Sequence, residues 1–429
     1  MCHPLGHRIL TASLVAVAVA SSGAVLCGCI GGPEPLSPDE ALAEAAERIN
    51  SILAEEPADV SSRAPFDLSE TPDDPSAIVF WYYSHPLIGT ALADPGKMEA
   101  FEGAYPGVTV KKQFIGEWHY AVQKLAVSLA AGDLPDVAVV KRGWLGPLVT
   151  SGRIVPLDLI LPAALIDDLR APFREALTVD GHLYAFPADG FCSVLFYNLD
   201  HIGSNPPKTW TDLREKANAA RTTDSPQEFY PIGAFPFLEG LWSAGGRVCE
   251  GKRSTLDGAA ARDTLGLFLE LRDAGLLEPH LVMAPAPAFD LFLSGRVAMT
   301  VASSESLPRC KGRPFTAGVC AVPGRDGPVS RVSDNVIVVF AKYAEPKREG
   351  IAGLLDFLTG PHVQGAQALA QGSSPVRRSV ADALDLGASG VEQARMAARY
   401  PPLRPSWSAI EAELHRYVEL AYRWRPEEP

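Results

Sequence analysis

The amino-acid sequence predicts an α/β protein with two lobes. Short apolar runs typical of buried strands alternate with segments whose apolar residues recur at helical spacing. The chain has 429 residues, of which 47% are hydrophobic, which is enough for two separate cores. The alternation predicts mainly parallel sheets flanked by helices on both faces, with ligands bound beyond the carboxyl ends of the strands.

Residues 1–28 are predicted to be a secretory signal. Arg8 precedes an apolar run over residues 9–20, and small residues follow the run. The run is short for a helix that spans a bilayer, which needs roughly 20 apolar residues. The stretch Leu-Cys-Gly-Cys that ends at Cys29 resembles a bacterial lipobox, so we expect Cys29 to be lipidated and to hold the chain on a membrane. Simple secretion is the alternative.

Residues 29–76 are expected to form the lipidated N-terminus and a tether. The stretch is rich in Pro, Asp, Glu, Ser and Ala, which favours an extended chain. One helix is predicted within it over residues 37–56, because its apolar residues recur at helical spacing and Ser37 or Asp39 can cap its start.

The body of the chain then alternates predicted strands and helices. Thr209 and Asp212 have the spacing of a capping box at the start of one helix. Strands are expected over residues 77–83, 108–114, 137–140, 194–197, 296–301 and 336–340. Helices are expected around residues 97–105 and over residues 118–131, 209–220, 259–274, 286–294, 346–358 and 407–424.

Several short motifs occur in an order that resembles a known family. The most specific is Ala-Ala-Gly-Asp-Leu-Pro-Asp-Val at residues 130–137. The others are Tyr-Pro-Gly-Val-Thr-Val at 105–110, Gly-Arg-Ile-Val-Pro-Leu-Asp at 152–158, Tyr-Ala-Phe-Pro at 184–187, Leu-Phe-Tyr-Asn at 195–198, Pro-Lys-Thr-Trp at 207–210, Trp-Ser-Ala-Gly-Gly at 242–246, Phe-Leu-Ser-Gly-Arg-Val-Ala-Met at 292–299 and Pro-Ser-Trp at 405–407. Over about residues 77–425, the chain resembles the sugar-binding type (family 1) of extracellular solute-binding proteins of ATP-binding-cassette importers.

The resemblance implies a two-lobe, type II periplasmic-binding-protein-like fold with a ligand cleft between the lobes. Lobe 1 would hold residues 77–187 and 331–376, and lobe 2 would hold residues 188–330 and 377–429. Hinge motion at the crossovers would close the lobes on a sugar or oligosaccharide. The resemblance also implies an extracytoplasmic monomer that delivers its ligand to the permease subunits of an importer and needs no cofactor.

Polar side chains near the ends of predicted strands are candidates for ligand contacts. They are Tyr83 and His85 after the first strand, Lys141 and Arg142 after the third, Asp189 beside the first crossover, and Asn335 at the start of the strand after a return crossover. For His85 a structural role is the alternative, and for the two basic residues a solvated loop is the alternative.

Aromatic rings are further candidates because they suit the flat faces of sugars. Trp242 and Trp407 match family positions near ligand, and Trp118 follows a turn that could face the cleft. Trp81 and Trp210 are instead predicted to be core residues.

Glu305 is a candidate that departs from the family pattern. It occupies a segment where many relatives carry Trp, which argues against a maltose-like stacking pocket. Because Lys141 and Arg142 are basic, glycerol phosphate or another polyol is the second ligand class.

Four cysteines beyond Cys29 are candidates for disulfides outside the cytoplasm. Cys310 and Cys320 would close a short loop, and Cys192 with Cys249 is then left by elimination. Metal ligation is the alternative, but no C-x-x-C or paired-His spacing supports it.

The sequence favours a binding protein over an enzyme. It contains no G-x-S-x-G elbow and no H-E-x-x-H zinc helix, and its nine histidines are scattered. We therefore expect no turnover, no catalytic residues and no metal. A secreted carbohydrate-active hydrolase and a surface adhesin or sensor partner are the rival classes. Because the net charge of −13 repels phosphate backbones, we expect no nucleic-acid partner.

Overall fold

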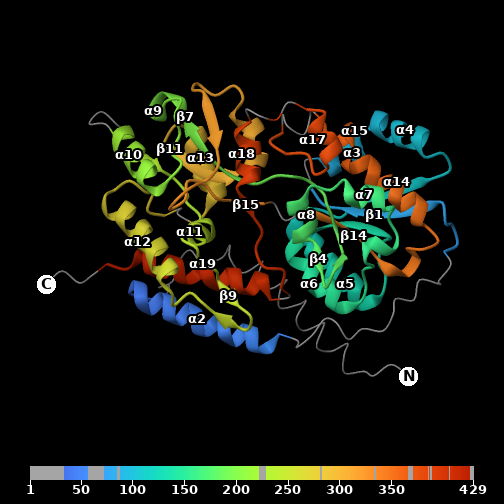
Figure 1. The fold of residues 1–429 in the computed structure, drawn as a ribbon, viewed down its shortest axis with the longest axis horizontal. Coiled ribbons are helices and arrows are strands. Elements are labelled where there is room, and N and C mark those ends of the chain that lie inside the picture. Colours follow the sequence, from blue (N-terminus) through green and yellow to red (C-terminus); the bar gives the residue numbers. More distant parts are fainter. Residues whose placement is uncertain are drawn as a thin grey trace.

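The computed structural model describes residues 33–56, 72–84, 87–221, 229–280, 283–332, 335–365, 371–384, 386, 389–404 and 406–425, without the side chains of Trp118 and His119. The chain forms two lobes that lie side by side, each with its own sheet and hydrophobic core (Figure 1). Within the described part of the chain, every helix is too short or too polar to cross a lipid bilayer.

Lobe 1 is built on a five-stranded sheet. In spatial order its strands are β2 (Thr109–Phe114), β1 (Ala77–Tyr82), β3 (Val137–Lys141), β14 (Asn335–Val339) and β6 (Phe186–Pro187). Its α-helices are α3 (Ile88–Ala93), α4 (Pro95–Ala104), α5 (Trp118–Ala131), α6 (Leu145–Ser151), α7 (Ala163–Asp167), α8 (Ala171–Ala176), α14 (Arg348–Thr359), α15 (Pro361–Gln364) and α17 (Arg378–Asp382). The smaller elements are the hairpin β4 (Thr178–Val179) and β5 (His182–Leu183) and the 3-10 turns η2 (Arg142–Trp144), η3 (Leu157–Leu159) and η5 (Ala341–Tyr343).

Lobe 2 is built on a four-stranded sheet. In spatial order its strands are β12 (Ala317–Cys320), β7 (Ser193–Asn198), β11 (Val297–Ser303) and β8 (Tyr230–Ile232). Its helices are α2 (Pro38–Glu55), α9 (Leu199–Ile202), α10 (Trp210–Ala220), α11 (Phe237–Ser243), α12 (Ala259–Asp273), α13 (Pro285–Leu293), η4 (Ser304–Cys310), α18 (Gly390–Met396) and α19 (Trp407–Arg423). A small hairpin joins β9 (Cys249–Glu250) to β10 (Arg253–Ser254).

The predicted α/β, two-lobe architecture is confirmed, but the sheets are mixed rather than mainly parallel. In lobe 1, β1 runs parallel to β2 and β3, whereas β14 runs antiparallel to both of its neighbours. In lobe 2, β7 is antiparallel to β11 and β12. The reason is that β7 and β14 enter directly from the other lobe, so no helical crossover sets their direction.

The lobes are joined by crossovers that bond to one another. One leads from β6 to β7 and another from β13 (Ser330–Arg331) to β14. β13 pairs with β15 (Ala398–Arg399), which comes from the last third of the chain. The backbones of Cys192 and Val332 form an isolated antiparallel β-bridge. The segments that connect the lobes therefore form one small hydrogen-bonded hinge.

The N-terminal helix α2 is part of lobe 2. Its start has the capping box predicted for Ser37, completed by Glu40. The helix lies along α19 (Figure 1), and its apolar face is buried in the lobe 2 core, with Ile49 and Leu53 at 0% exposure. At its end Glu56 pairs with Arg404 at 2.6 Å. The helix predicted over residues 37–56 is therefore present. Its apolar stripe packs it on the body, so residues 33–56 are not part of the tether expected over residues 29–76.

The other predicted elements occur within a few residues of their expected ends. The capping box of Thr209 and Asp212 is present, and α5 ends at Gly132, whose φ of 77° suits a glycine after a helix. The boundary expected at residue 376 is displaced, because α17 bonds to lobe 1 through Ser379 and Asp168.

Candidate functional site

A pocket of about 340 Å³ lies between the lobes, where the end of β3 faces the start of β7 and the end of β11. Its volume is at the small end of the range for ligand sites. The described lining residues are Lys141, Cys192, Ser193, Ala234, Pro236, Phe237, Leu238, Glu239, Met283, Pro285, Val301, Ala302, Ser303, Glu305, Arg331, Val332 and His415. Two of the predicted site residues, Lys141 and Glu305, are among them.

Lys141 forms the lobe 1 side of this lining. It is the last residue of β3 and stands directly opposite Asn335, the first residue of antiparallel β14. Its Nζ donates a hydrogen bond to Oδ1 of Asn335 at 2.7 Å and lies 5.7 Å from the ring centroid of Tyr83. The register of the two strands therefore fixes the position of the ammonium group.

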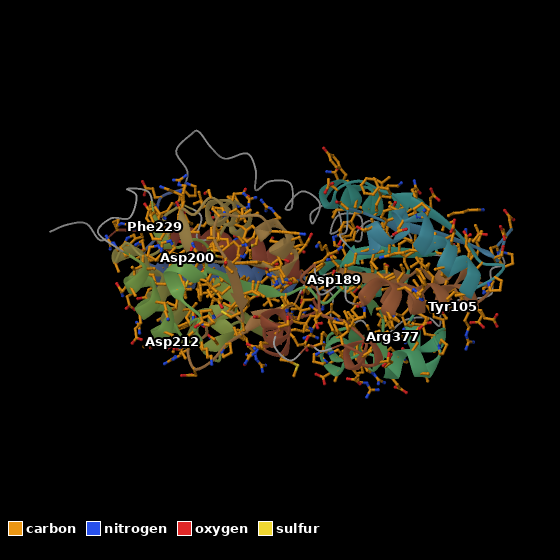
Figure 2. All side chains as sticks on the ribbon, turned by 90° about the horizontal axis from the view of Figure 1, so that it is seen from above. Tyr105, Asp189, Asp200, Asp212, Phe229 and Arg377 are labelled. Carbon is orange, nitrogen blue, oxygen red and sulfur yellow. The ribbon has the colours of Figure 1, made fainter. Side chains whose placement is uncertain are left out.

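Asn335 joins the predicted polar residues of lobe 1 into one network. The hydroxyl of Tyr83 donates to Oδ1 of Asn335, and Nδ2 of Asn335 donates to Oδ2 of Asp189 at 2.7 Å. Tyr83, Asp189 and Asn335 are all buried. Asp189 lies at the junction of the lobes, whereas Tyr105 and Arg377 lie well inside lobe 1 (Figure 2). The structure thus brings together Tyr83, Lys141, Asp189 and Asn335.

The lobe 2 side of the pocket centres on Ser193 and Glu239. Ser193 begins β7 and pairs in register with Ser303, the last residue of β11. Its hydroxyl accepts a hydrogen bond from the amide of Arg331 at 2.7 Å and bonds the carboxyl group of Glu239. Burial raises the pKa of Glu239, although Arg331 and Ser193 favour its ionised form.

Two ionisable side chains of α19, Glu411 and His415, lie beside this wall. The guanidinium group of Arg331 pairs with the carboxylate of Glu411. Burial is the largest influence on Glu411 and opposes its ionisation. The charge and hydrogen bond of Arg331, together with His415 and Trp407, outweigh burial, so the pKa of Glu411 lies below its usual value. Burial lowers the pKa of His415, which keeps its imidazole neutral at pH 7.

Glu305 lies at the exposed rim of the pocket. The hydroxyl of Ser303 caps η4 by accepting a hydrogen bond from the amide of Glu305 at 3.3 Å. The pocket therefore combines ammonium, guanidinium and hydroxyl donors with carboxyl acceptors, which is the chemistry that binds a polar, hydroxyl-bearing solute.

Arg142 stabilises the hinge and does not line the pocket. Its Nη1 donates to the carbonyl of Pro401 at 2.7 Å, and its Nη2 donates to the carbonyl of Ala176 at 2.9 Å. Only 4% of the residue is exposed. The ligand contact expected for Arg142 is therefore corrected to a structural one. Arg142 follows the last residue of β3, and successive side chains at a strand end point in opposite directions, so it cannot share the direction of Lys141.

The two tryptophans expected to stack on ligand are core residues of lobe 2. Trp242 is 6% exposed on α11 and Trp407 is 3% exposed at the start of α19. Their rings fill space between helices, so the stacking role predicted for them is wrong. Trp118 begins α5, but its side chain is outside the described atoms, and His85 is outside the described residues. As predicted, Trp81 and Trp210 are buried.

The predicted disulfides are absent, because Cys192, Cys249, Cys310 and Cys320 are free thiols. Cys249 and Cys320 belong to the hydrophobic cluster on one face of the lobe 2 sheet, and Cys192 and Cys310 belong to the cluster on the other. Each predicted pair would have to cross that sheet. Cys29, the predicted lipidation site, lies outside the described residues.

Sequence reasoning missed Ser193, Glu239, Arg331 and His415. Ser193 lies at the amino end of β7 and reaches the edge that faces the cleft because β7 runs antiparallel to β11, which the expectation of a parallel sheet did not foresee. Glu239 and His415 lie within helices, where nothing in the local pattern distinguishes them from solvated residues. Among the described residues, no cluster of three His, Cys, Asp or Glu side chains could hold a metal ion.

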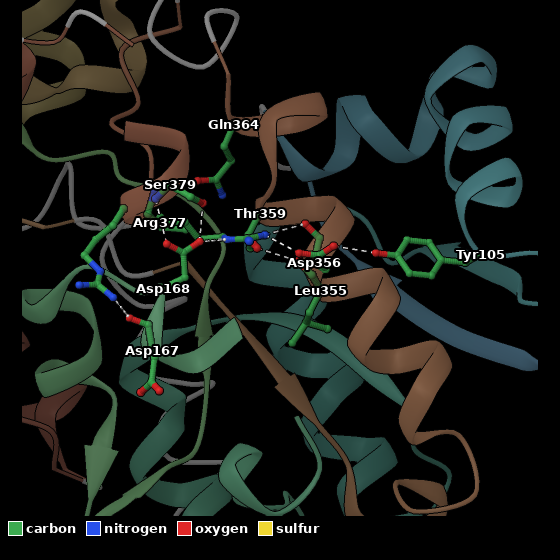
Figure 3. A network of polar contacts seen from close by, with 11 residues as sticks. Tyr105, Asp167, Asp168, Leu355, Asp356, Thr359, Gln364, Arg377 and Ser379 are labelled. Atoms are coloured by element: carbon green, nitrogen blue, oxygen red, sulfur yellow. Dashed lines mark hydrogen bonds and ion pairs between the residues drawn. The ribbon is translucent and has the colours of Figure 1, made fainter. Parts of the chain in front are cut away.

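A second polar network in lobe 1 has a structural role (Figure 3). Arg377 donates to Asp168 at 2.7 Å and to Asp356 at 2.6 Å, and Asp356 accepts a hydrogen bond from the hydroxyl of Tyr105 at 2.7 Å. Burial and the bond to Asp356 raise the pKa of Tyr105 to about 12. The network fastens α17 to α14 and to the end of α7.

Comparison with known proteins identifies relatives over most of the body. Residues 97–394 match the model of a family described as bacterial extracellular solute-binding protein. A binding protein of Brucella abortus (strain 2308) is 26% identical over 347 residues, which cover 73% of this chain and 80% of the relative. The maltotriose-binding protein of Pyrococcus abyssi is 24% identical over 319 residues, which cover 69% of this chain and 68% of the relative.

Solved structures share the fold at low sequence identity. The sugar-binding protein MalE of Xanthomonas citri has a TM-score of 0.67 at 22% identity, over 81% of this chain and 92% of that chain. UgpB of Mycobacterium tuberculosis, solved with glycerophosphocholine, has a TM-score of 0.65 at 20% identity, over 80% of this chain and 92% of that chain.

Proposed function

Because the chain belongs to the family of bacterial extracellular solute-binding proteins, we propose that it captures a small sugar or polyol in the pocket between its lobes. The observation that carries the proposal is the pocket itself, in which Lys141 of lobe 1 faces Ser193, Glu239 and Glu305 of lobe 2. A solute that touches both lobes binds the closed form better than the open form, so binding shifts the population towards closure.

The size and lining of the pocket favour a short solute. Its volume of about 340 Å³ and its polar groups suit one or two sugar rings held by hydrogen bonds. Trp242 and Trp407 lie in the core, so neither offers a stacking surface for a long oligosaccharide. The maltotriose-binding relative from Pyrococcus abyssi supports a sugar as the first choice.

A phosphate-bearing polyol is the second candidate. Lys141 and Arg331 bring two cationic groups to the pocket lining, and such groups bind phosphate oxygens strongly. The structural likeness to a protein solved with glycerophosphocholine agrees with this choice.

In this proposal the protein binds its solute without changing it chemically and passes the solute to the permease subunits of an importer. Lipid at Cys29 would keep it at the membrane, outside the cytoplasm. Labelled palmitate tests the anchor: the label should enter the wild-type protein and should not enter Cys29→Ala. Incubation of the purified protein with maltose, maltotriose or glycerophosphocholine tests whether it turns its solute over. An increase in reducing ends or a release of phosphate would contradict the proposal that the solute is bound without chemical change.

A thermal-shift screen with maltose, maltotriose, tagatose, glycerol 3-phosphate and glycerophosphocholine tests the binding proposal. A solute present at 100 times its dissociation constant adds about 2.7 kcal/mol to the free energy of unfolding, which raises Tm by several degrees. Glu305→Ala at the rim should weaken binding of the active compound several-fold. Glu345→Ala, an exposed site in lobe 1 outside this pocket, is the matched control and should not. If no sugar or polyol shifts Tm, the proposal is wrong.

A further inference from the structure

The two lobes contribute very unequally to the pocket. Among the described lining residues, the side chains of lobe 2 and of the crossovers form the floor and most of the rim, and lobe 1 contributes Lys141. Among the residues that the structure describes, a solute resting on lobe 2 therefore meets lobe 1 at the ammonium group of Lys141.

That ammonium group is connected to the hinge. Its partner Asn335 is where the second crossover enters lobe 1, and Asn335 bonds Asp189 on the first crossover. The carboxylate of Asp189 also accepts the amide of Phe191 at 3.0 Å, and the amide of Ala188 donates to the carbonyl of Asn335 at 3.1 Å. The chain of bonds from Lys141 thus ends on the backbone of the segments that must bend when the lobes close.

We propose that Lys141 is the residue through which a bound solute draws lobe 1 onto lobe 2, and that Asn335 and Asp189 are positioning residues that aim its ammonium at the pocket. This inference rests on the proposed function. It specifies the solute further, because the end of the solute that faces lobe 1 must carry an oxygen acceptor, either a sugar hydroxyl or a phosphate oxygen.

The chemistry of lysine suits this role. An ammonium group has three donors, so Lys141 can keep its bond to Asn335 while it donates to a solute oxygen. The contact exists only when the lobes are closed, so it contributes to the difference in affinity between the closed and open forms, and that difference drives closure. Removing the ammonium should affect compaction of the protein more than contact of the solute with lobe 2.

The experiment compares wild type, Lys141→Met, Lys141→Arg and the control Lys111→Met, an exposed lysine of β2. Maltotriose and glycerophosphocholine are the probes, with calorimetry for affinity and X-ray scattering for the radius of gyration. Lys141→Met should bind about 10- to 100-fold more weakly, the range expected for loss of one charged hydrogen bond. At saturation it should keep the radius of the unloaded protein. Lys141→Arg should recover compaction, and Lys111→Met should match wild type.

A double-mutant cycle tests the positioning role of Asn335. Asn335→Ala should weaken binding of the same probe in the wild-type background and have no further effect in the Lys141→Met background. If Asn335→Ala weakens binding equally in both backgrounds, Asn335 has only a structural role, and the positioning role proposed for it is overturned.

The outcomes separate the two proposals. If Lys141→Met compacts fully at saturation, the role proposed for Lys141 is overturned, and the proposed function still stands. A wild-type protein that binds neither probe nor any compound of the thermal-shift screen overturns both.

Discussion

The hydroxyl of Ser193 accepts a hydrogen bond from the amide of Arg331 at 2.7 Å, so the two crossovers that frame the pocket are joined at its floor. The same hydroxyl bonds the buried carboxyl group of Glu239. The groups that would contact a solute and the groups that hold the hinge are therefore the same small set of residues. Substitutions at the pocket should for this reason also change the free energy of unfolding.

Glu239→Gln should make stability less dependent on pH. The raised pKa of Glu239 means that the folded protein binds its proton more tightly than the unfolded chain does. Its contribution to stability is complete below pH 4.5 and is lost as pH rises through the folded pKa. The variant should thus gain stability relative to wild type over this rise, by about 1.4 kcal/mol per unit of pKa shift.

Urea unfolding without solute, at intervals from pH 4.5 to 8, measures this difference. Glu44→Gln, at an exposed site on α2, is the control. A difference between Glu239→Gln and wild type that stays constant with pH would contradict the assignment.

Ile49→Ala should destabilise lobe 2, although Ile49 lies in the N-terminal region expected to be a tether. The residue is 0% exposed in the lobe 2 core, and truncation of such a side chain typically costs about 2–5 kcal/mol. Glu47→Ala, on the exposed face of the same helix, should change stability by less than about 0.5 kcal/mol. Scanning calorimetry compares the two, and equal small effects would mean that α2 does not pack on the body.

Arg377→Met should destabilise lobe 1 by about 2 kcal/mol, because it leaves Asp168 and Asp356 without a partly buried cation. Burial opposes ionisation of Asp168, but Ser379 and Arg377 outweigh it and hold its pKa below the usual value. That stabilisation is present above about pH 4 and is lost as pH falls. Wild type should therefore lose stability on acidification more steeply than the variant.

Arg174→Met is the matched control for this prediction, because its pair with Asp167 is exposed and should contribute about 0–1 kcal/mol. Denaturant unfolding at pH 7 and pH 3 gives both quantities. Parallel losses of stability in wild type and Arg377→Met on acidification would count against the network.

The cysteines should titrate as four free thiols when the mature protein is unfolded without reductant. In the native protein Cys310 should react first, because it is the least buried of the four. Burial raises the pKa of all four thiols, and that of Cys192 and of Cys320 to about 12 each. Thiol titration with mass mapping of the labelled residue checks the order. Fewer than four thiols in the unfolded chain would restore the disulfide hypothesis.

Much of the fold could be predicted from local pattern. The apolar runs of β1, β3 and β14 and the caps of α2 and α10 depend on neighbours in sequence, and these elements occur where they were expected. Lys141 could also be placed at the edge of the sheet from sequence, because it ends a predicted strand. The ligand contacts expected of Tyr83, Lys141 and Asn335 stay predictions.

What the sequence by itself determined is therefore the set of elements and the two-lobe α/β class. Only the tertiary structure decided that Trp242 and Trp407 are core, that Arg142 holds the hinge, that Glu239 and His415 join the pocket, and that the cysteines lie on opposite faces of a sheet. The physical reason is that helix and strand formation depends on residues a few positions apart. Which side chain reaches a pocket depends instead on register and packing between segments far apart in the chain.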